Sequence, residues 1–189
     1  MRSFYQFCIL SIISAIVILA INRTVNAQSD NFKTYTNKDL GFTVQYPSKW
    51  KSNDDLGSLG DGVYFRSAGS PTREFAVTVK KIEPYLDTDT MTLQNTSLQQ
   101  YVQKKLDDDR KNSVMLGLPY TFIRQNEVTV GGNPAWKIEY TMDNYDFEIF
   151  TIANGKLYQL SYDEEPLKVP ETLPLANKVV ESFRFVDNK

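Results

Sequence analysis

An Asn-Gly turn between two strand-like segments constrains the fold of this chain more than any other feature of its sequence. Asn154-Gly155 separates residues 147–152 from residues 156–162. Asn and Gly adopt the positive φ angles of a two-residue hairpin turn, so these segments are predicted to be adjacent antiparallel strands. A second tight turn, Gly131-Gly132-Asn133, predicts the same arrangement just before them. The predicted strands of this half are residues 120–123, 128–130, 135–140, 147–152 and 156–162.

The first half of the chain also has strand periodicity. Phe42, Val44 and Tyr46 alternate with polar residues until Pro47, as in a strand with one buried face. The Gly-, Asp- and Ser-rich residues 52–62 predict a loop. Further strands are predicted near Tyr35 and at residues 63–65 and 75–79.

Two segments have helical spacing instead. Within residues 97–112 the inner positions are Leu98, Tyr101, Val102, Lys105 and Leu106, and Asn95 or Thr96 is placed to cap the helix. Near the end of the chain Leu175, Val179, Val180 and Phe183 form one stripe, with Pro170 and Pro174 bounding its start. Strands in antiparallel succession with two helices predict an α+β fold, a central antiparallel sheet flanked by helices.

The amino terminus predicts export. Arg2 precedes an apolar run, residues 4–21, and Val25 and Ala27 are the small residues of a signal-peptidase site. We predict a signal peptide at residues 1–27 and one domain at residues 28–189, secreted or held in the cell envelope. The alternative is an uncleaved leader that anchors the chain, because the apolar run is at the short limit for spanning a bilayer.

Two missing side-chain types exclude most catalytic chemistry. The chain of 189 residues has no His, and its one cysteine, Cys8, lies in the leader. The mature domain therefore has no imidazole base, thiol nucleophile, disulfide or Cys/His zinc site. A formal net charge of −2 provides no excess of cations for nucleic acid. We predict no enzyme activity, no cofactor and no nucleic-acid partner.

Acidic residues are the remaining candidates for a site. Asp54, Asp55 and Asp61 lie in one predicted loop and are weak candidates for a metal ion, although their spacing does not fit a calcium loop. Asp107-Asp108-Asp109 splay around a helix and are expected to be solvated.

Two further acidic groups and a sequon have alternative interpretations. Asp143, Asp146 and Glu148 could form a catalytic carboxylate pair only if they opposed each other across a cleft; the favoured interpretation is polar positions along a turn and strand. Residues 163–165 predict an acidic rim or a solvated loop. Asn95 opens a glycosylation sequon that helix capping also explains.

Four segments have a recognisable pattern: residues 41–50, GFTVQYPSKW, followed by residues 130–134, 154–158 and 179–185. In sequence and in order they resemble the PsbP family, the extrinsic lumenal proteins of photosystem II and their relatives, and the first looks like the family's opening signature. The resemblance implies an antiparallel sheet covered by helices and an extrinsic, non-enzymatic role. Photosynthetic members help to retain calcium and chloride; this chain departs from them in having no His and a secretory leader.

These observations together predict a function class. The chain is expected to be an exported accessory protein that holds a protein partner or a small ligand outside the cytoplasm. A peripheral position at the membrane stays open. The alternative is a calcium-dependent or carboxylate-based hydrolase that uses Asp and Glu alone.

Overall fold

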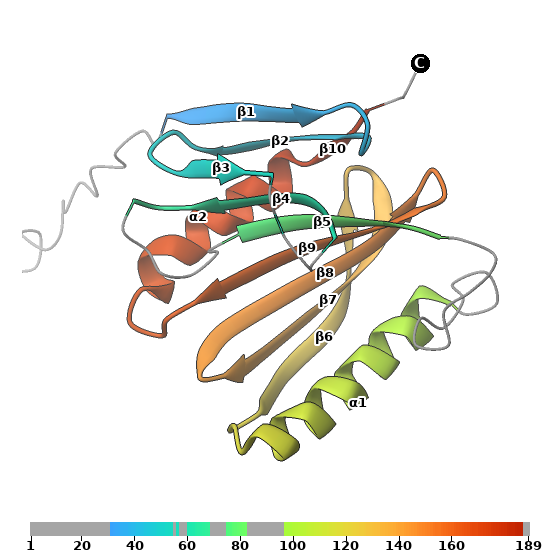
Figure 1. The fold of residues 1–189 in the computed structure, drawn as a ribbon, viewed down its shortest axis with the longest axis vertical. Coiled ribbons are helices and arrows are strands. Elements are labelled where there is room, and N and C mark those ends of the chain that lie inside the picture. The colour runs from blue at the N-terminus through green and yellow to red at the C-terminus, as the bar shows by residue number, and fades with distance from the viewer. Residues whose placement is uncertain (1–30, 55, 57–59, 69–74, 83–96, 187–189) are drawn as a thin grey trace, which may run out of the picture. The chain divides into compact units, whose positions relative to one another are not determined.

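Two antiparallel sheets and two helices make up the fold (Figure 1). The computed structural model describes residues 31–54, 56, 60–68, 75–82 and 97–186, all of which belong to one compact unit, Asn31–Lys189. The helices are α1 (Leu98–Leu116) and α2 (Val169–Ser182). The strands are β1 (Phe32–Asn37), β2 (Phe42–Pro47), β3 (Lys51–Asn53), β4 (Asp61–Arg66), β5 (Phe75–Lys81), β6 (Thr121–Val130), β7 (Asn133–Met142), β8 (Asn144–Ala153), β9 (Lys156–Glu164) and β10 (Arg184–Phe185).

The large sheet has the strand order β3-β4-β5-β9-β8-β7-β6, and every neighbouring pair is antiparallel. Strands β6 to β9 follow one another through tight turns. Asn154 and Gly155 have φ angles of 51° and 69° in the β8–β9 turn, which are the left-handed values that this turn type requires. Strands β1, β2 and β10 form the small sheet, in the order β1-β2-β10.

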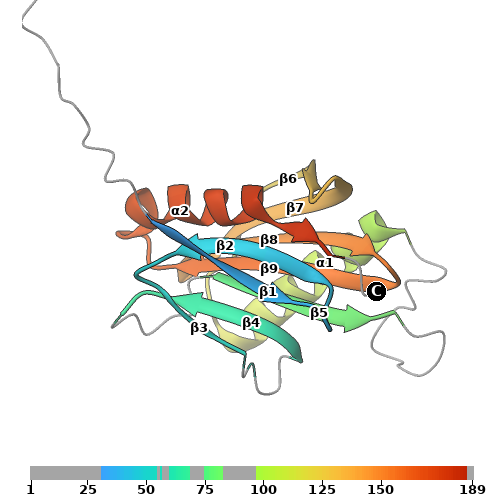
Figure 2. The same ribbon diagram turned by 90° about the horizontal axis from the view of Figure 1, so that it is seen from above.

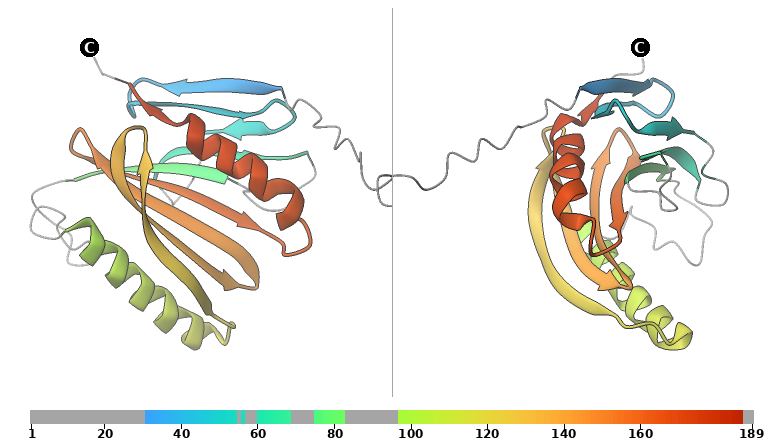
Figure 3. Two further views of the ribbon diagram at one scale, coloured as in Figure 1. Left: turned by 180° about the vertical axis from the view of Figure 1, so that it is seen from behind. Right: turned by 90° about the vertical axis from the view of Figure 1, so that its left-hand side faces the viewer.

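Each face of the large sheet has its own core. Figures 1 and 3 show α1 against one face and α2 behind the other. The small sheet lies on the α2 side, next to that helix, as the view from above shows (Figure 2). Residues of both sheets and α2 form the larger core, whereas Val102 and Leu106 of α1 pack on Ile138, Phe150 and Leu157 in the second.

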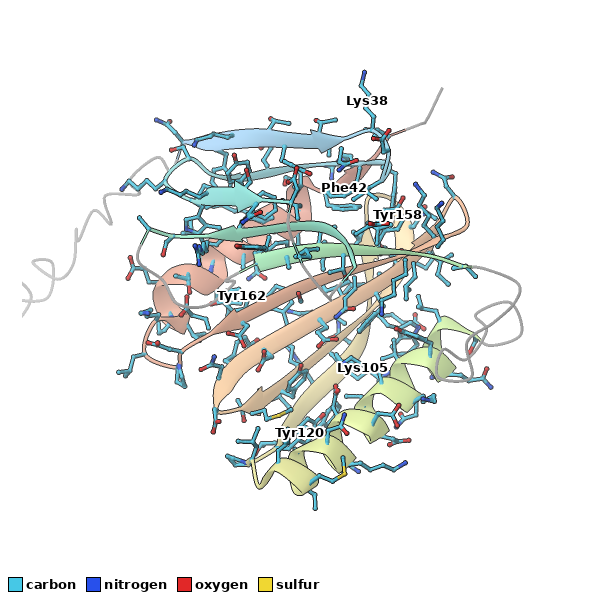
Figure 4. The ribbon with its side chains drawn as sticks, in the orientation of Figure 1. Lys38, Phe42, Lys105, Tyr120, Tyr158 and Tyr162 are labelled. Carbon is cyan, nitrogen blue, oxygen red and sulfur yellow. The ribbon has the colours of Figure 1, made fainter. Side chains whose placement is uncertain are left out.

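Aromatic rings join α2 and the small sheet to the large sheet. Phe42 of β2 stacks on Phe183 at the end of α2, with 5.5 Å between ring centroids. The Tyr158 hydroxyl of β9 donates a hydrogen bond of 2.8 Å to the Leu40 carbonyl, and Figure 4 shows Phe42 and Tyr158 close together. These contacts join the segments near both ends of the domain to the large sheet.

The predicted α+β class, with an antiparallel sheet flanked by helices, is confirmed, but several details of the elements are corrected. Ser97 is the N-cap of α1, since its side chain accepts from the Gln100 amide and the Gln100 side chain accepts from the Ser97 amide. Pro174 lies inside α2 rather than at its start. Residues 120–123 and 128–130 belong largely to one strand, β6, and part of the predicted loop at residues 52–62 is strand.

The division into a signal peptide at residues 1–27 and a mature domain from residue 28 stays a prediction, because residues 1–30 lie outside the described part of the chain. Among the described helices, none is both long and apolar enough to cross a membrane.

Candidate functional site

Carboxyl groups gather on the face of the large sheet that α1 covers in part. Asp146 and Glu148 of β8 point to this face, because the intervening Phe147 is buried in the core on the α2 side. Asp163 of β9 is the register partner of Asp146. We call Lys105, Tyr140, Asp146, Glu148, Gln159 and Asp163 the carboxylate network.

Glu148 is the centre of this network. Its Oε1 accepts hydrogen bonds from the Tyr140 hydroxyl at 2.9 Å and from Lys105 Nζ at 3.3 Å. Its Oε2 accepts from Gln159 Nε2 at 3.1 Å. Lys105 also bonds Asp109 of α1 at 2.6 Å, so Glu148 links α1 to β7, β8 and β9.

The surroundings of Lys105 and Tyr140 keep both groups protonated. Burial alone would lower the pKa of Lys105, but the charges of Glu148 and Asp109 outweigh it and raise that pKa. Burial raises the pKa of Tyr140, and the Glu148 charge adds to the effect. Both groups therefore act as hydrogen-bond donors to Glu148.

Asp146 and Asp163 form a pair of facing carboxyl groups. Burial, followed by the charge of Asp163 and a hydrogen bond to it, raises the pKa of Asp146 to about 8. Such a bond between carboxyl groups needs one proton, because two carboxylates only accept. Asn144 Nδ2 donates to Asp163 Oδ1 at 2.9 Å. The pair thus holds a proton at neutral pH in a half-buried position.

Two tyrosine rings border the network beneath α1. Tyr120 stacks on Tyr140 with 5.5 Å between ring centroids, and Figure 4 shows Tyr120 and Lys105 in the layer between the helix and the sheet. The Tyr120 hydroxyl is buried and has no hydrogen-bond partner among the described residues. Burial raises the pKa of this phenol.

A second buried carboxylate, Glu139 of β7, lies on the α2 side of the sheet. It binds Arg124 and Lys137, each at 2.8 Å, and accepts a hydrogen bond of 2.7 Å from the Tyr145 hydroxyl. Burial alone would raise the pKa of Glu139, but these three partners lower it. Glu139 is therefore a charged, fully partnered group that ties β6 to β7 and β8.

This geometry is that of a structural network and not of an opposed catalytic pair. Glycoside hydrolysis needs two carboxyl groups roughly 5 to 10 Å apart on opposite sides of a bond. Asp146 instead lies beside its register partner Asp163 on the neighbouring strand, and both oxygens of Glu148 already accept bonds within the protein. Among the described residues no three acidic side chains are grouped to hold a metal ion.

The other acidic residues singled out in the sequence are dispersed. Asp54 follows β3 and Asp61 begins β4, and both are exposed; Asp55 lies outside the described residues, so a metal ion there stays a weak prediction. Asp143 is exposed in the β7–β8 turn. The helical aspartates do not converge: Asp107, Asp108 and Asp109 bond Gln103, Lys104 and Lys105, respectively.

The prediction for residues 163–165 was wrong in part. Asp163 and Glu164 belong to β9, which continues to pair with β8 at Tyr145, and Glu164 is fully buried. Asn95 of the glycosylation sequon lies outside the described residues.

Sequence reasoning missed the partners of Glu148. Lys105 is 43 residues away from it in the chain, and Gln159 lies on a different strand. One signal was present: Asp146 and Glu148 alternate with apolar residues in a strand that has neighbours on both sides. Polar side chains at every second position of an inner strand indicate either an exposed face or a buried polar network.

The free edge of β6 is the second notable surface. β6 is the last strand of the large sheet and, in the part of the chain that the structure describes, pairs only with β7. Most of its side chains are exposed, and only Val130 at its end is buried. A bulge at Ile123 interrupts the pairing near its start, and the stretch from Arg124 to Val130 is regular.

The orientation of the β6 backbone follows from Pro134. Thr129 is the register partner of Pro134, which has no N–H, and the Pro134 carbonyl accepts a hydrogen bond of 2.9 Å from the side-chain hydroxyl of Thr151 on β8. Pro134 therefore directs its backbone groups toward β8, and its partner Thr129 directs its own away from β7. By alternation, Gln125 and Glu127 also direct N–H and C=O groups to the open side.

The comparisons with known proteins agree on one fold. A family model, PsbP, matches residues 30–185. The solution structure of cyanobacterial PsbP (CyanoP) from Synechocystis sp. PCC 6803 is similar, with a TM-score of 0.60 and 19% identity over 82% of this chain and 93% of that one. The crystal structure of LpqN, involved in cell envelope biogenesis of Mycobacterium tuberculosis, has a TM-score of 0.51 and 12% identity over 85% and 94% of the two chains. None of the curated proteins matches this sequence.

Proposed function

Because this chain belongs to the PsbP family, whose model covers residues 30–185, we propose that it is an exported, non-catalytic accessory protein that holds a protein partner. The free edge of β6 is the observation that carries the proposal. An extended segment of the partner would add a strand beside β6, and main-chain hydrogen bonds would hold it there.

The backbone of β6 is suited to such pairing. Thr129, Glu127 and Gln125 have N–H and C=O groups on the open side, and natural proteins usually protect long edges with charges, proline or bulges. Here the bulge protects only the start of the strand. The Arg124 guanidinium is already bound to Glu139 of the same sheet, so it protects the edge less than a free cation would.

The carboxylate network supports a non-catalytic role. Glu148 accepts hydrogen bonds at both oxygens, and Asp163 Oδ1 accepts a hydrogen bond from Asn144. A hydrolase would need one of these groups free to attack or to protonate a substrate. The leader predicted at residues 1–27 supports a site of action outside the cytoplasm.

The test compares which protein is recovered from the native cell envelope by wild type and by two variants of Thr129. Thr129→Pro removes an outward N–H and fits an edge strand, whereas Thr129→Ala removes the side chain and keeps the N–H. Wild type and Thr129→Ala are expected to recover the same protein in stoichiometric amount, and Thr129→Pro is expected to lose it. Recovery by all three, or by none, contradicts the proposal. Matching thermal unfolding midpoints would show that both variants are folded.

A further inference from the structure

Exposed apolar side chains concentrate at one end of the domain. Among the described residues six large apolar side chains are exposed, and five of them lie where α1 ends and β6 begins. Figures 1 and 3 show these two element ends side by side. We call this set the apolar tip: Val114, Met115, Leu116, Phe122 and Ile123. Single exposed apolar residues are ordinary, but a contiguous group marks an interaction site.

The arrangement of the three helical residues limits what can cover them. Val114, Met115 and Leu116 are 77%, 76% and 69% exposed. Consecutive residues of a helix point about 100° apart, so these three side chains spread around the helix and do not share one face. A flat protein surface could cover only part of such a group. A fluid apolar medium can surround all of it.

The turn after α1 keeps the tip at the end of the molecule. Gly117 ends the helix in the left-handed conformation, with φ 67°, and the chain then turns into β6. Phe122 and Ile123 are 41% and 46% exposed. Ile123 has no register partner on β7 because of the bulge.

Charge near the tip favours an anionic surface. Arg110 and Lys111 are exposed and lie about one turn before the tip. Asp108 and Asp109 of the helix form ion pairs with Lys104 and Lys105, respectively, which lie one turn nearer the start of the helix and farther from the tip. The tip thus has Arg110 and Lys111 behind it, and the exposed Asp143 of the β7–β8 turn lies at the same end of the sheet. The two cations would be attracted to the acidic headgroups of an anionic membrane.

We propose that the apolar tip inserts into the interfacial layer of an anionic lipid bilayer and holds the domain at the membrane surface, with α1 end-on to the membrane. This inference goes beyond the proposed partner-binding function and stands independently of it. The occupant is the lipid bilayer itself, and the cations bind its acidic headgroups.

The test uses residues 28–189, which contain the whole compact unit Asn31–Lys189 and lack the apolar leader. Co-sedimentation is measured with vesicles of equal parts phosphatidylcholine and phosphatidylglycerol, and with phosphatidylcholine alone. The tip variant is Val114→Gln with Met115→Gln and Leu116→Gln. Its matched control is Leu167→Gln, at a site 95% exposed and outside the tip.

Wild type and Leu167→Gln are expected to bind the mixed vesicles equally, and the tip variant to bind at least about tenfold more weakly. Arg110→Gln with Lys111→Gln is expected to remove the preference for phosphatidylglycerol. No vesicle binding by wild type, or equal binding by the tip variant, would overturn the proposal.

Sedimentation velocity without lipid distinguishes the other occupants. If wild type is a dimer and the tip variant a monomer, the tip is a contact between copies and the lipid proposal fails. If the tip variant no longer recovers the envelope protein partner and wild type does not bind vesicles, the tip is a protein contact and the lipid proposal also fails. Thr129→Pro is expected to bind vesicles like wild type, so failure of the partner proposal would not affect this result.

Discussion

Replacing Asp146 by asparagine is expected to stabilise the domain at neutral pH and to leave its stability near pH 4 almost unchanged. In the native state the pKa of Asp146 is raised to about 8, whereas an unfolded aspartate titrates near about 3.9. Between these values the folded chain keeps a proton that the unfolded chain has released. The free energy of unfolding therefore falls as pH rises through this window.

The change in the free energy of unfolding follows from the interval between the folded and unfolded pKa values of Asp146. A full proton difference changes the free energy of unfolding by about 1.4 kcal/mol per pH unit. Asp146 is only half-buried, so solvent screening reduces the total cost at neutral pH to about 1–2 kcal/mol. The asparagine side chain would carry no charge, and its amide can still donate to Asp163.

The assay is urea unfolding followed by fluorescence of Trp50 and Trp136, repeated from about pH 4 to about pH 8. The wild type is expected to lose stability across this range relative to Asp146→Asn. Asp143→Asn is the matched control, because it makes the same chemical change at an exposed turn position with φ 70°, which asparagine tolerates. Its profile should parallel that of wild type. Parallel profiles for Asp146→Asn and wild type would refute the raised pKa of Asp146.

Two further substitutions test the other parts of the networks. Lys105→Met removes the cation that joins α1 to Glu148, and is expected to lower the free energy of unfolding by about 1–3 kcal/mol and to speed amide hydrogen exchange in α1. Lys104→Met, at an exposed ion pair of the same helix, should lower it by less than about 0.5 kcal/mol. Equal effects of the two substitutions would contradict the role of Lys105 as a link between α1 and the sheet. Glu139→Gln removes a carboxylate whose pKa in the folded state is lowered despite burial. The charge of Glu139 therefore stabilises the fold above the pKa of an unfolded glutamate, and this stabilisation is lost as pH falls through the lowered pKa of the folded state. The free energy of unfolding of Glu139→Gln should be about 1–3 kcal/mol lower than that of wild type at neutral pH, and the difference should disappear in acid. A difference that does not depend on pH would contradict the stabilising role of the Glu139 charge.

Much of the fold could be predicted because its signals are local. The Asn154-Gly155 turn, the alternation in β2 and the helical spacing from Leu98 each act within a few residues, and together they indicate antiparallel strands with two helices. The small sheet could not be predicted in this way. β10 has two residues and pairs with β2, far away in the chain, so its position depends on tertiary contacts such as that of Phe42 with Phe183.

The candidate site was less predictable because it depends on which strand faces which helix. The sequence singled out Asp146 and Glu148 but provided no way to pair Glu148 with Lys105 or Gln159. It also placed Asp163 in a loop, because three adjacent acidic residues before Pro166 have the composition of a turn. Register with β8 keeps Asp163 and Glu164 in the sheet, where Glu164 is buried.

The most direct test of partner binding is amide hydrogen exchange along β6 in the presence of the protein recovered from the envelope. Strand addition predicts slower exchange at the outward amides of Gln125, Glu127 and Thr129, with little change in β3 at the other edge of the sheet. Protection of other surfaces with no change at these three amides would contradict the proposal that β6 is the binding edge.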